Sequence, residues 1–119
     1  WFIDPMSPTC DPGDHREHEH APLPDGQLAR AARMGAAMGE PGRLRLLALL
    51  LDGRHCVSEL TEETGDSASL VSQRLRVLAD AELLNRTREG KHVFYSLADD
   101  HVRILVRNLL SHADDHQPR

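Results

Sequence analysis

Apolar residues recur at the three- and four-residue spacing of an α-helix in five segments of the chain. Glycine or proline punctuates the first three of them, as expected at helix ends. In one further segment apolar and polar residues alternate, which indicates β-structure. The helical segments are 27–38, 41–51, 56–64, 67–81 and 99–116, and the alternating segment is 83–97. The pattern therefore predicts a mainly α-helical fold with one small β-hairpin.

The last predicted helix carries an apolar stripe with a histidine at each edge. The stripe consists of Val102, Leu105, Val106, Leu109, Leu110 and Ala113. His101 and His112 are eleven residues apart. Helix geometry places them about 20° out of line and roughly 16 Å apart along the axis. One ion therefore cannot contact both histidines of the same helix.

A second copy of the chain would bring these histidines together. If two copies of the helix pack antiparallel about a two-fold axis, His101 of one lies beside His112 of the other, and this contact occurs twice. Asp99 and Asp115 add a carboxylate beside each histidine. Each end then offers two nitrogens and two oxygens, a tetrahedral set suited to zinc, or to cobalt or nickel with added ligands. The same pattern also fits a dimerisation helix whose polar edges are solvated.

Residues 56–81 have the pattern of a helix-turn-helix. A short helix stops at Gly65, and Asp66 or Ser67 can cap the next helix. The apolar residues predicted to share the inner face of this next helix are Leu70, Val71, Leu75 and Leu78. Its outer face is expected to enter the major groove of DNA with Ser69, Ser72, Gln73, Arg74 and Arg76. An ordinary surface helix has a similar polar side.

The alternating segment predicts two strands joined by a turn at Glu89 and Gly90. The side chains near its tip are basic: Arg86, Arg88, Lys91 and His92. A basic hairpin tip is weak information by itself. After a helix-turn-helix, it indicates a wing that lies on the DNA phosphates.

The distribution of charge supports a nucleic-acid partner better than the total does. The chain of 119 residues has a net charge of −5, which at first argues against nucleic acid. Residues 1–25 carry six acids and one arginine, whereas residues 67–92 carry five basic residues against three acids. The middle of the chain is therefore locally basic. Because one Trp, one Tyr and two Phe leave a modest core, a homodimer that buries more surface is also favoured.

The first residues of the chain differ in composition from the rest, with four prolines and three histidines in residues 7–25. Side chains of the kind that bind transition metals cluster there: Cys10, Asp14, His15, His18 and His20. Short His-rich tracts also occur without function. We expect a Cys- and His-containing arm over 1–25, of which 1–5 are extraneous sequence, a domain over 26–116 and a tail over 117–119.

Several classes of protein are excluded by what the sequence lacks. Two cysteines, Cys10 and Cys56, do not make a disulfide framework, so we expect thiols or metal ligands. The chain has no apolar run of about 18 residues and no signal segment, so we expect a cytoplasmic protein without a membrane partner. It has no Ser/His/Asp or Cys/His set and no phosphate-binding glycine loop. We therefore expect no enzyme and no small-molecule substrate.

The order of elements and five short strings resemble the ArsR/SmtB family of dimeric winged-helix metal-sensing repressors. The strings are EPxRLxxL over 40–47, CVxEL over 56–60, VSxxLxxL over 71–78, REGK over 88–91 and YxL over 95–97. The resemblance spans about residues 27–116 and implies a winged helix-turn-helix that dimerises through its terminal helices. It implies contacts to double-stranded operator DNA from Ser69, Ser72, Gln73, Arg86, Arg88 and Lys91.

The resemblance also implies two metal sites, each shared between protomers. The first maps to Asp99, His101, His112 and Asp115. The family has glutamate or histidine at the fourth position, and because aspartate is shorter than glutamate, His116 is a possible substitute. The second joins Cys10 and one or more of His15, His18 and His20 to Cys56 and Glu59 of the partner. Thiolates there favour zinc, cadmium or lead. Many relatives keep one of the two sites, and Cys56 can equally be a small buried hydrophobe.

These features favour a repressor that binds operator DNA as a homodimer when metal-free and is released by Zn²⁺, with Cd²⁺, Co²⁺, Ni²⁺ and Pb²⁺ as alternatives. Two other functions stay open. One is a winged-helix regulator that senses oxidation of Cys10 or Cys56. The other is a zinc-buffering protein whose His-rich arm stores the ion.

Overall fold

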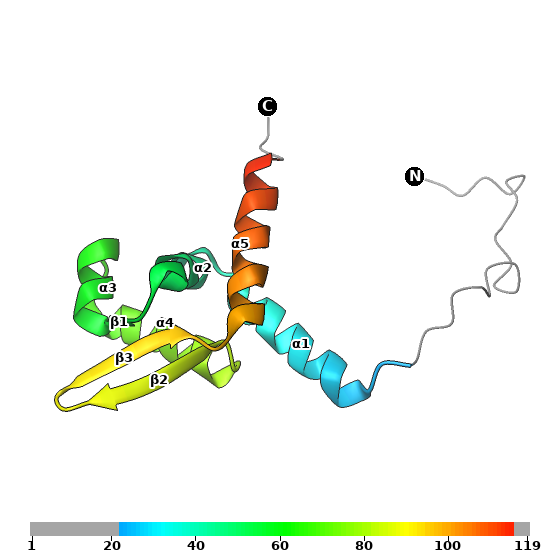
Figure 1. Cartoon of the computed structure of the whole chain (residues 1–119), viewed down its shortest axis with the longest axis horizontal. Helices are drawn as coiled ribbons and strands as arrows, with labels where there is room; N and C mark the ends of the chain where they lie inside the picture. Colours follow the sequence, from blue (N-terminus) through cyan, green and yellow to red (C-terminus); the bar gives the residue numbers. More distant parts are fainter. Residues whose placement is uncertain (1–21, 116–119) are drawn as a thin grey trace, which may run out of the picture.

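The computed structural model describes residues 22–115 and contains five α-helices and three strands (Figure 1). The helices are α1 (Asp25–Met38), α2 (Pro41–Leu49), α3 (Val57–Thr64), α4 (Ala68–Asp80) and α5 (Asp100–Asp115), and the strands are β1 (His55–Cys56), β2 (Leu84–Glu89) and β3 (His92–Leu97). The predicted tail over 117–119 and nearly all of the predicted arm lie outside the described residues. The predicted helices and hairpin are confirmed.

Aliphatic side chains from α2, α3, α4 and α5 meet in one core. The side chains with 0–1 % exposure are Leu46, Leu47, Leu50, Leu60, Val71, Leu75, Leu78, Leu83 and Val106. No charged or polar residue of residues 22–115 is buried in it. Burial of this apolar surface drives the helices together. In Figure 1, α5 stands upright at the centre, with α1 and the β2–β3 hairpin extending to opposite sides.

The corner between α1 and α2 is closed by two side chains. The Glu40 carboxylate caps α2 by accepting hydrogen bonds from the backbone N–H groups of Gly42 at 3.0 Å and Arg43 at 2.7 Å. These two bonds are the main reason why the pKa of Glu40 is lowered. The Arg43 guanidinium in turn donates to the carbonyls of Ala37 at 2.7 Å and Ala36 at 3.3 Å, at the end of α1.

The sheet has three strands rather than the two predicted, in the order β1-β3-β2. His55 pairs with Tyr95 and Cys56 with Phe94, so the helix predicted over 56–64 begins one residue later, at Val57. Cys56 has an extended backbone and is the N-cap residue of α3. A two-residue strand is too short to produce an alternating pattern of its own, and only its long-range partner β3 defines it.

Two other expectations differ from the structure in detail. The second helix ends at Leu49 and tightens into a 3₁₀ turn over Leu50–Asp52 instead of continuing as α-helix to Leu51. Leu70, predicted on the inner face of α4, is 36 % exposed. Helix geometry explains this, because Leu70 lies about 140° around α4 from the fully buried Leu75.

The two leucines of α4 provide a test of this packing. Leu75→Ala is expected to lower the free energy of unfolding by roughly 2–5 kcal/mol, because it opens a cavity at a site with 0 % exposure. Leu70→Ala is the matched control on the same helix and is expected to cost less than half as much. Urea denaturation of both variants measures the difference, and equal losses would contradict the arrangement.

Candidate nucleic-acid interface and candidate metal ligands

The turn between α3 and α4 is held by its own side chains. Gly65 ends α3 in the left-handed region (φ 75°), which favours glycine, and its N–H donates to the Thr61 carbonyl at 2.8 Å. Ser67 Oγ caps α4 by accepting the Leu70 N–H at 3.1 Å. The Asp66 N–H donates to Thr64 Oγ1 at 3.2 Å. These bonds fix the angle at which α4 leaves the turn, as a helix-turn-helix requires.

The outer side of α4 carries a polar strip of exposed side chains, Ser69, Gln73 and Arg76. They follow one another at intervals of four and three residues and so share one helix face. Ser72 is half-buried beside the strip. Hydroxyl, amide and guanidinium groups at this spacing have the hydrogen-bonding capacity to contact base edges and phosphates.

A cleft of about 420 Å³ separates α4 from the sheet. Ser72 and Arg76 line it from α4, and Arg86 and Tyr95 line it from β2 and β3. The strand register pairs Arg86 with Tyr95 and Arg88 with Val93, so the two arginines project from the same face of the hairpin. Arg88 and Lys91 are exposed near the Gly90 turn. Arg76 of the α4 strip and Arg86 of the hairpin therefore border the same cleft.

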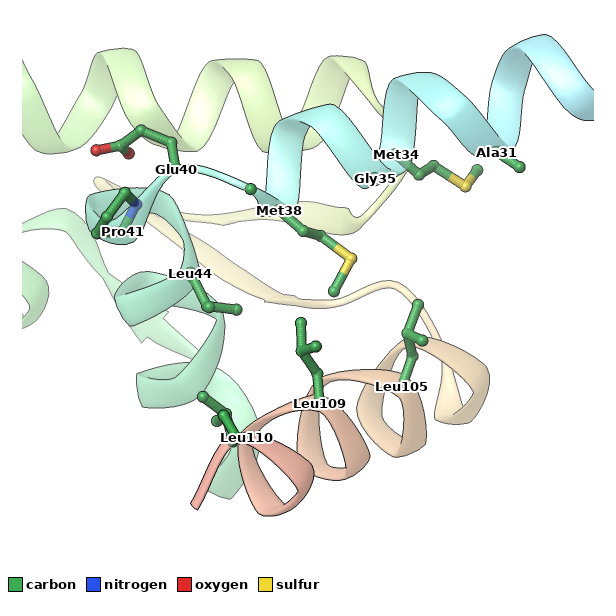
Figure 2. Close-up of a pocket in the computed structure, with 12 residues that line it drawn as sticks. Ala31, Met34, Gly35, Met38, Glu40, Pro41, Leu44, Leu105, Leu109 and Leu110 are labelled. Carbon is green, nitrogen blue, oxygen red and sulfur yellow. The ribbon is translucent and has the colours of Figure 1, made fainter. Parts of the chain in front are cut away.

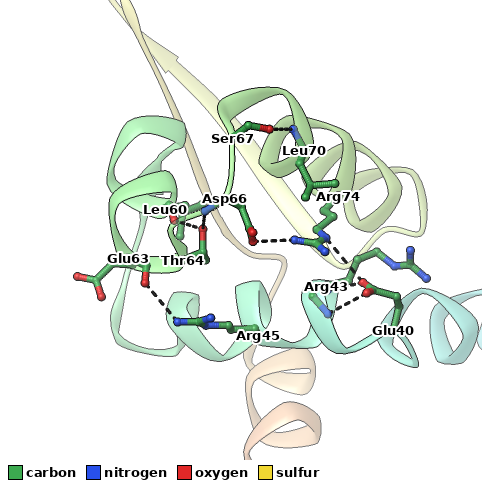
Figure 3. A network of polar contacts seen from close by, with 11 residues as sticks. Glu40, Arg43, Arg45, Leu60, Glu63, Thr64, Asp66, Ser67, Leu70 and Arg74 are labelled. Atoms are coloured by element: carbon green, nitrogen blue, oxygen red, sulfur yellow. Dashed lines mark hydrogen bonds and ion pairs between the residues drawn. The ribbon is translucent and has the colours of Figure 1, made fainter.

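The expectation that Arg74 faces solvent with Arg76 was wrong. Its guanidinium lies between α2 and the helix-turn-helix turn, 2.8 Å from Asp66 Oδ2 and 3.9 Å from Glu40 Oε2 (Figure 3). It packs so closely on Gly42 that a Cβ there would come within 2.3 Å of it. Two residues along a helix turn the side chain by roughly 200°, which explains the opposite directions of these neighbours. Arg74 therefore connects α4 to α2.

The predicted ligands of the first metal site lie along α5. Asp99 is placed before the helix, where its Oδ1 caps α5 by accepting the Val102 N–H at 3.0 Å. The same oxygen lies 3.8 Å from His101 Nδ1, and the His101 side chain is 97 % exposed. His112 and Asp115 are exposed in the last turn. His116 lies outside the described residues.

Cys56 and Glu59, from the second predicted metal site, lie next to each other at the start of α3. Glu59 Oε1 accepts the Cys56 N–H at 3.1 Å, and Glu59 Oε2 lies 3.3 Å from His55 Nδ1. The cap to Cys56 is the largest cause of the lowered pKa of Glu59. His55 Nε2 lies 3.0 Å from Asp52, and this hydrogen bond raises the pKa of His55. Sequence reasoning missed both the cap and the histidine that supports it.

The partners expected for Cys56 and Glu59, namely Cys10, His15, His18 and His20, lie outside the described residues, as does Asp14. Within residues 22–115 of one chain, no three His, Cys, Asp or Glu side chains are grouped closely enough to hold a metal ion. Imidazole nitrogens and carboxylate oxygens are among the ligands that zinc takes in a tetrahedral site. A metal site built from α5 therefore needs further ligands from outside residues 22–115 of the same chain.

An apolar groove of about 580 Å³ runs between α1 and α5 (Figure 2). Met34 and Met38 enter it from α1, and Leu105 and Leu109 enter it from α5. Leu105 is 51 % exposed and Leu109 is 42 % exposed, although both belong to the predicted apolar stripe. Val102 and Val106 of the same stripe are buried in the core. In this single chain, α5 therefore buries only part of its apolar surface.

Comparison with protein families identifies a regulator. The model described as "Bacterial regulatory protein, arsR family" matches residues 40–86. A transcriptional repressor SmtB homolog from Synechocystis is 35 % identical over 113 residues, which is 91 % of this chain and 86 % of the relative. The HTH-type transcriptional regulator NmtR of Mycobacterium tuberculosis is 35 % identical over 99 residues, with 83 % of this chain and 82 % of NmtR covered. These relatives are transcriptional regulators, which agrees with the expectation that the chain is not an enzyme.

Two solved structures share the fold. The solution structure of apo-NmtR superposes with a TM-score of 0.68 at 33 % identity, and the match covers 88 % of each chain. The homodimeric winged helix-turn-helix DNA-binding domain of a possible ArsR-family regulator from Mycobacterium bovis has a TM-score of 0.75 at 29 % identity, covering 83 % of this chain and 94 % of that one. The winged helix-turn-helix prediction is thus confirmed.

Within residues 22–115, no helix has the length and apolar content needed to cross a bilayer.

The neighbouring arginines of α4 are expected to behave differently. Arg74→Ala should lower the free energy of unfolding by on the order of 1–2 kcal/mol, because it removes the ion pair with Asp66. The Arg74 side chain is only 22 % exposed, so this ion pair is partly shielded from solvent. Arg76→Ala, the matched control, should change it by less than about 0.5 kcal/mol. Thermal unfolding of both variants measures this, and an equally stable Arg74→Ala protein would contradict the structural role.

Proposed function

Because the chain belongs to the ArsR family of bacterial regulatory proteins, we propose that it is a metal-responsive repressor that binds operator DNA as a homodimer and releases it when a divalent ion binds. The observation that carries the proposal is that Arg76 of the α4 strip and Arg86 of the hairpin border one cleft, with Arg88 and Lys91 exposed further along the hairpin. We assign groove reading to Ser69, Gln73 and Arg76, which are exposed on α4, and phosphate contacts to Arg86 and Arg88 of the hairpin.

A second copy of this chain is the proposed occupant of the surface between α1 and α5. The exposed leucines of this groove and the small size of the core favour an apolar partner. The M. bovis relative of the same fold is homodimeric. A two-fold dimer presents two α4 helices, and DNA binding requires their separation to match about 34 Å, one turn of B-DNA.

The proposed regulatory ligands are Asp99 and His101 of one protomer with His112 and Asp115 of the other. The exposure of His101 leaves it accessible to a partner, and the donor set of two imidazoles and two carboxylates suits Zn²⁺. Cd²⁺, Co²⁺, Ni²⁺ and Pb²⁺ are the alternatives. His116 is an alternative fourth ligand.

The proposed second site uses Cys56 and Glu59 with Cys10 and histidines of the arm. Its thiolates would make it softer than the α5 site. Glu59 already caps α3 through the Cys56 N–H. A metal ion that takes the Glu59 carboxylate would therefore compete with this cap, which connects metal binding at the site to the first helix of the helix-turn-helix.

Contacts within the chain support a route from α5 to the DNA-binding elements. Val102 and Val106 pack in the core, and the Arg103 guanidinium donates a hydrogen bond to the Leu51 carbonyl, just before β1 and α3. A metal ion that pins α5 to its partner would act on these elements through those contacts. A coupling of only about 1.4 kcal/mol changes operator affinity tenfold.

Zinc is expected to weaken DNA binding. The probe is a duplex that the wild-type protein enriches from a random-sequence pool, and the readout is fluorescence anisotropy with and without Zn²⁺. The Kd should rise at least tenfold with zinc. Unchanged affinity with zinc demonstrably bound would contradict the switch, and failure to enrich any duplex would contradict DNA recognition.

Substitutions separate the two proposed metal sites. His101→Ala should bind the metal-free probe normally but lose its response to zinc, whereas Cys56→Ser should keep the response. His101 is a cleaner choice than Asp99, because Asp99 also caps α5. The opposite result would assign regulation to the second site. A zinc response retained in both single variants would contradict regulation that depends on either site alone.

A charged substitution in the groove between α1 and α5 tests the proposed dimer surface. Leu109→Glu is expected to shift the protein from dimer to monomer, because it places a carboxylate in the apolar groove. Leu70→Glu is the matched control, a similarly exposed leucine on α4. Sedimentation velocity reports the state of each variant. A Leu109→Glu protein that remains dimeric would place the interface elsewhere.

A further inference from the structure

We propose that Arg54 is a positioning residue for the wing, which holds the β2–β3 hairpin in its DNA-binding orientation and neutralises Glu89 on the face opposite the wing arginines. Arg54 lies in the loop before β1, outside both the helix-turn-helix and the hairpin. This role rests on the DNA binding proposed above. Arg54 is not one of the residues of α4 or the hairpin that we assign to DNA contacts.

The contacts of Arg54 reach across the sheet to the end of the hairpin. Its two terminal nitrogens lie 2.8 and 3.0 Å from the two carboxylate oxygens of Glu89, a bidentate pair between residues 35 positions apart. Its guanidinium carbon also lies 4.1 Å from the centroid of the Phe94 ring. An isolated exposed ion pair contributes little, but two-point pairing together with stacking fixes the geometry.

The strand register places this contact on the face opposite the wing arginines. Along β2, Arg86 and Arg88 alternate with Thr87 and Glu89, so the arginines and Glu89 project from opposite faces. Phe94 pairs with Thr87 and therefore lies on the Glu89 face. The basic side borders the cleft below α4, and the Arg54 side faces away from it.

The hairpin needs support because β1 covers little of it. The register of β1 with β3 extends only to Tyr95 and Phe94, and the hairpin continues beyond them to the turn at Gly90. A two-stranded hairpin is only marginally stable by itself. Arg54 adds a side-chain connection from the body of the domain to Glu89, the last residue of β2.

The pair also determines the charge that the wing presents. Glu89 lies between Arg88 and Lys91 in the sequence, where an unpaired carboxylate would repel phosphates. Arg54 neutralises it from the far face, and their hydrogen bond lowers the pKa of Glu89. The basic groups of the hairpin then act on DNA without an opposing charge.

A double-mutant cycle on the enriched duplex tests this role. Arg54→Ala is expected to weaken binding about five- to tenfold, Arg54→Lys less than threefold, and Glu89→Gln less than threefold. In the Glu89→Gln background, Arg54→Ala should have less than a twofold effect and leave the salt dependence of binding unchanged. Arg30→Ala removes the same charge from α1, which extends away from the hairpin in Figure 1, and is the control for net charge.

The other outcomes overturn the proposal in distinguishable ways. An equal loss from Arg54→Ala in both backgrounds, with a salt slope smaller by about one, would make Arg54 a direct phosphate contact. Unchanged binding by Arg54→Ala, with normal binding by the wild type, would remove the positioning role and leave the repressor function intact. A wild-type protein that recognises no duplex would remove both. Thermal unfolding of each variant verifies that the proteins compared are folded.

Discussion

Burial of the aliphatic face of α4 is the constraint on which the rest of the structure depends. Val71, Leu75 and Leu78 are completely excluded from solvent against α2 and α3, and this fixes the rotation of α4 about its own axis. The positions around a helix are fixed relative to one another. The packing of the apolar face therefore also determines which polar side chains of α4 point outward. Gln73 and Arg76 face solvent, whereas Arg74 turns towards Asp66 and Glu40.

One part of the apolar surface of α5 is buried in the core of the chain, and another part is exposed. Val102 and Val106 complete the core of their own chain, while Leu105 and Leu109 remain exposed over the groove beside α1. A domain of this size gains stability when such surface is covered. The metal ligands proposed on α5, His101 among them, belong to the same helix as this exposed surface.

Much of the fold can be predicted from periodicity, because each long helix leaves its own apolar pattern in the sequence. The features that are harder to predict depend on partners distant in sequence. Cys56 becomes a strand residue only by pairing with Phe94, and Arg54 finds Glu89 only through the register of three strands. The prediction placed Arg74 on the outer face of α4 because several basic and polar residues occur there. Arg74 lies about 200° around the helix from Arg76, so the two side chains point in opposite directions.

The corner between α1 and α2 has a mechanical consequence. The last carbonyls of α1 are bound by Arg43, and the first amides of α2 by Glu40, so the two helix ends share their side-chain caps across a single turn of chain. We expect this joint to resist bending, because a change in the angle between the two helices would break several of these hydrogen bonds. A displacement of α1 by a neighbouring molecule would then move α2 with it. The contacts of Arg74 with Glu40 and Gly42 would transmit this movement to α4.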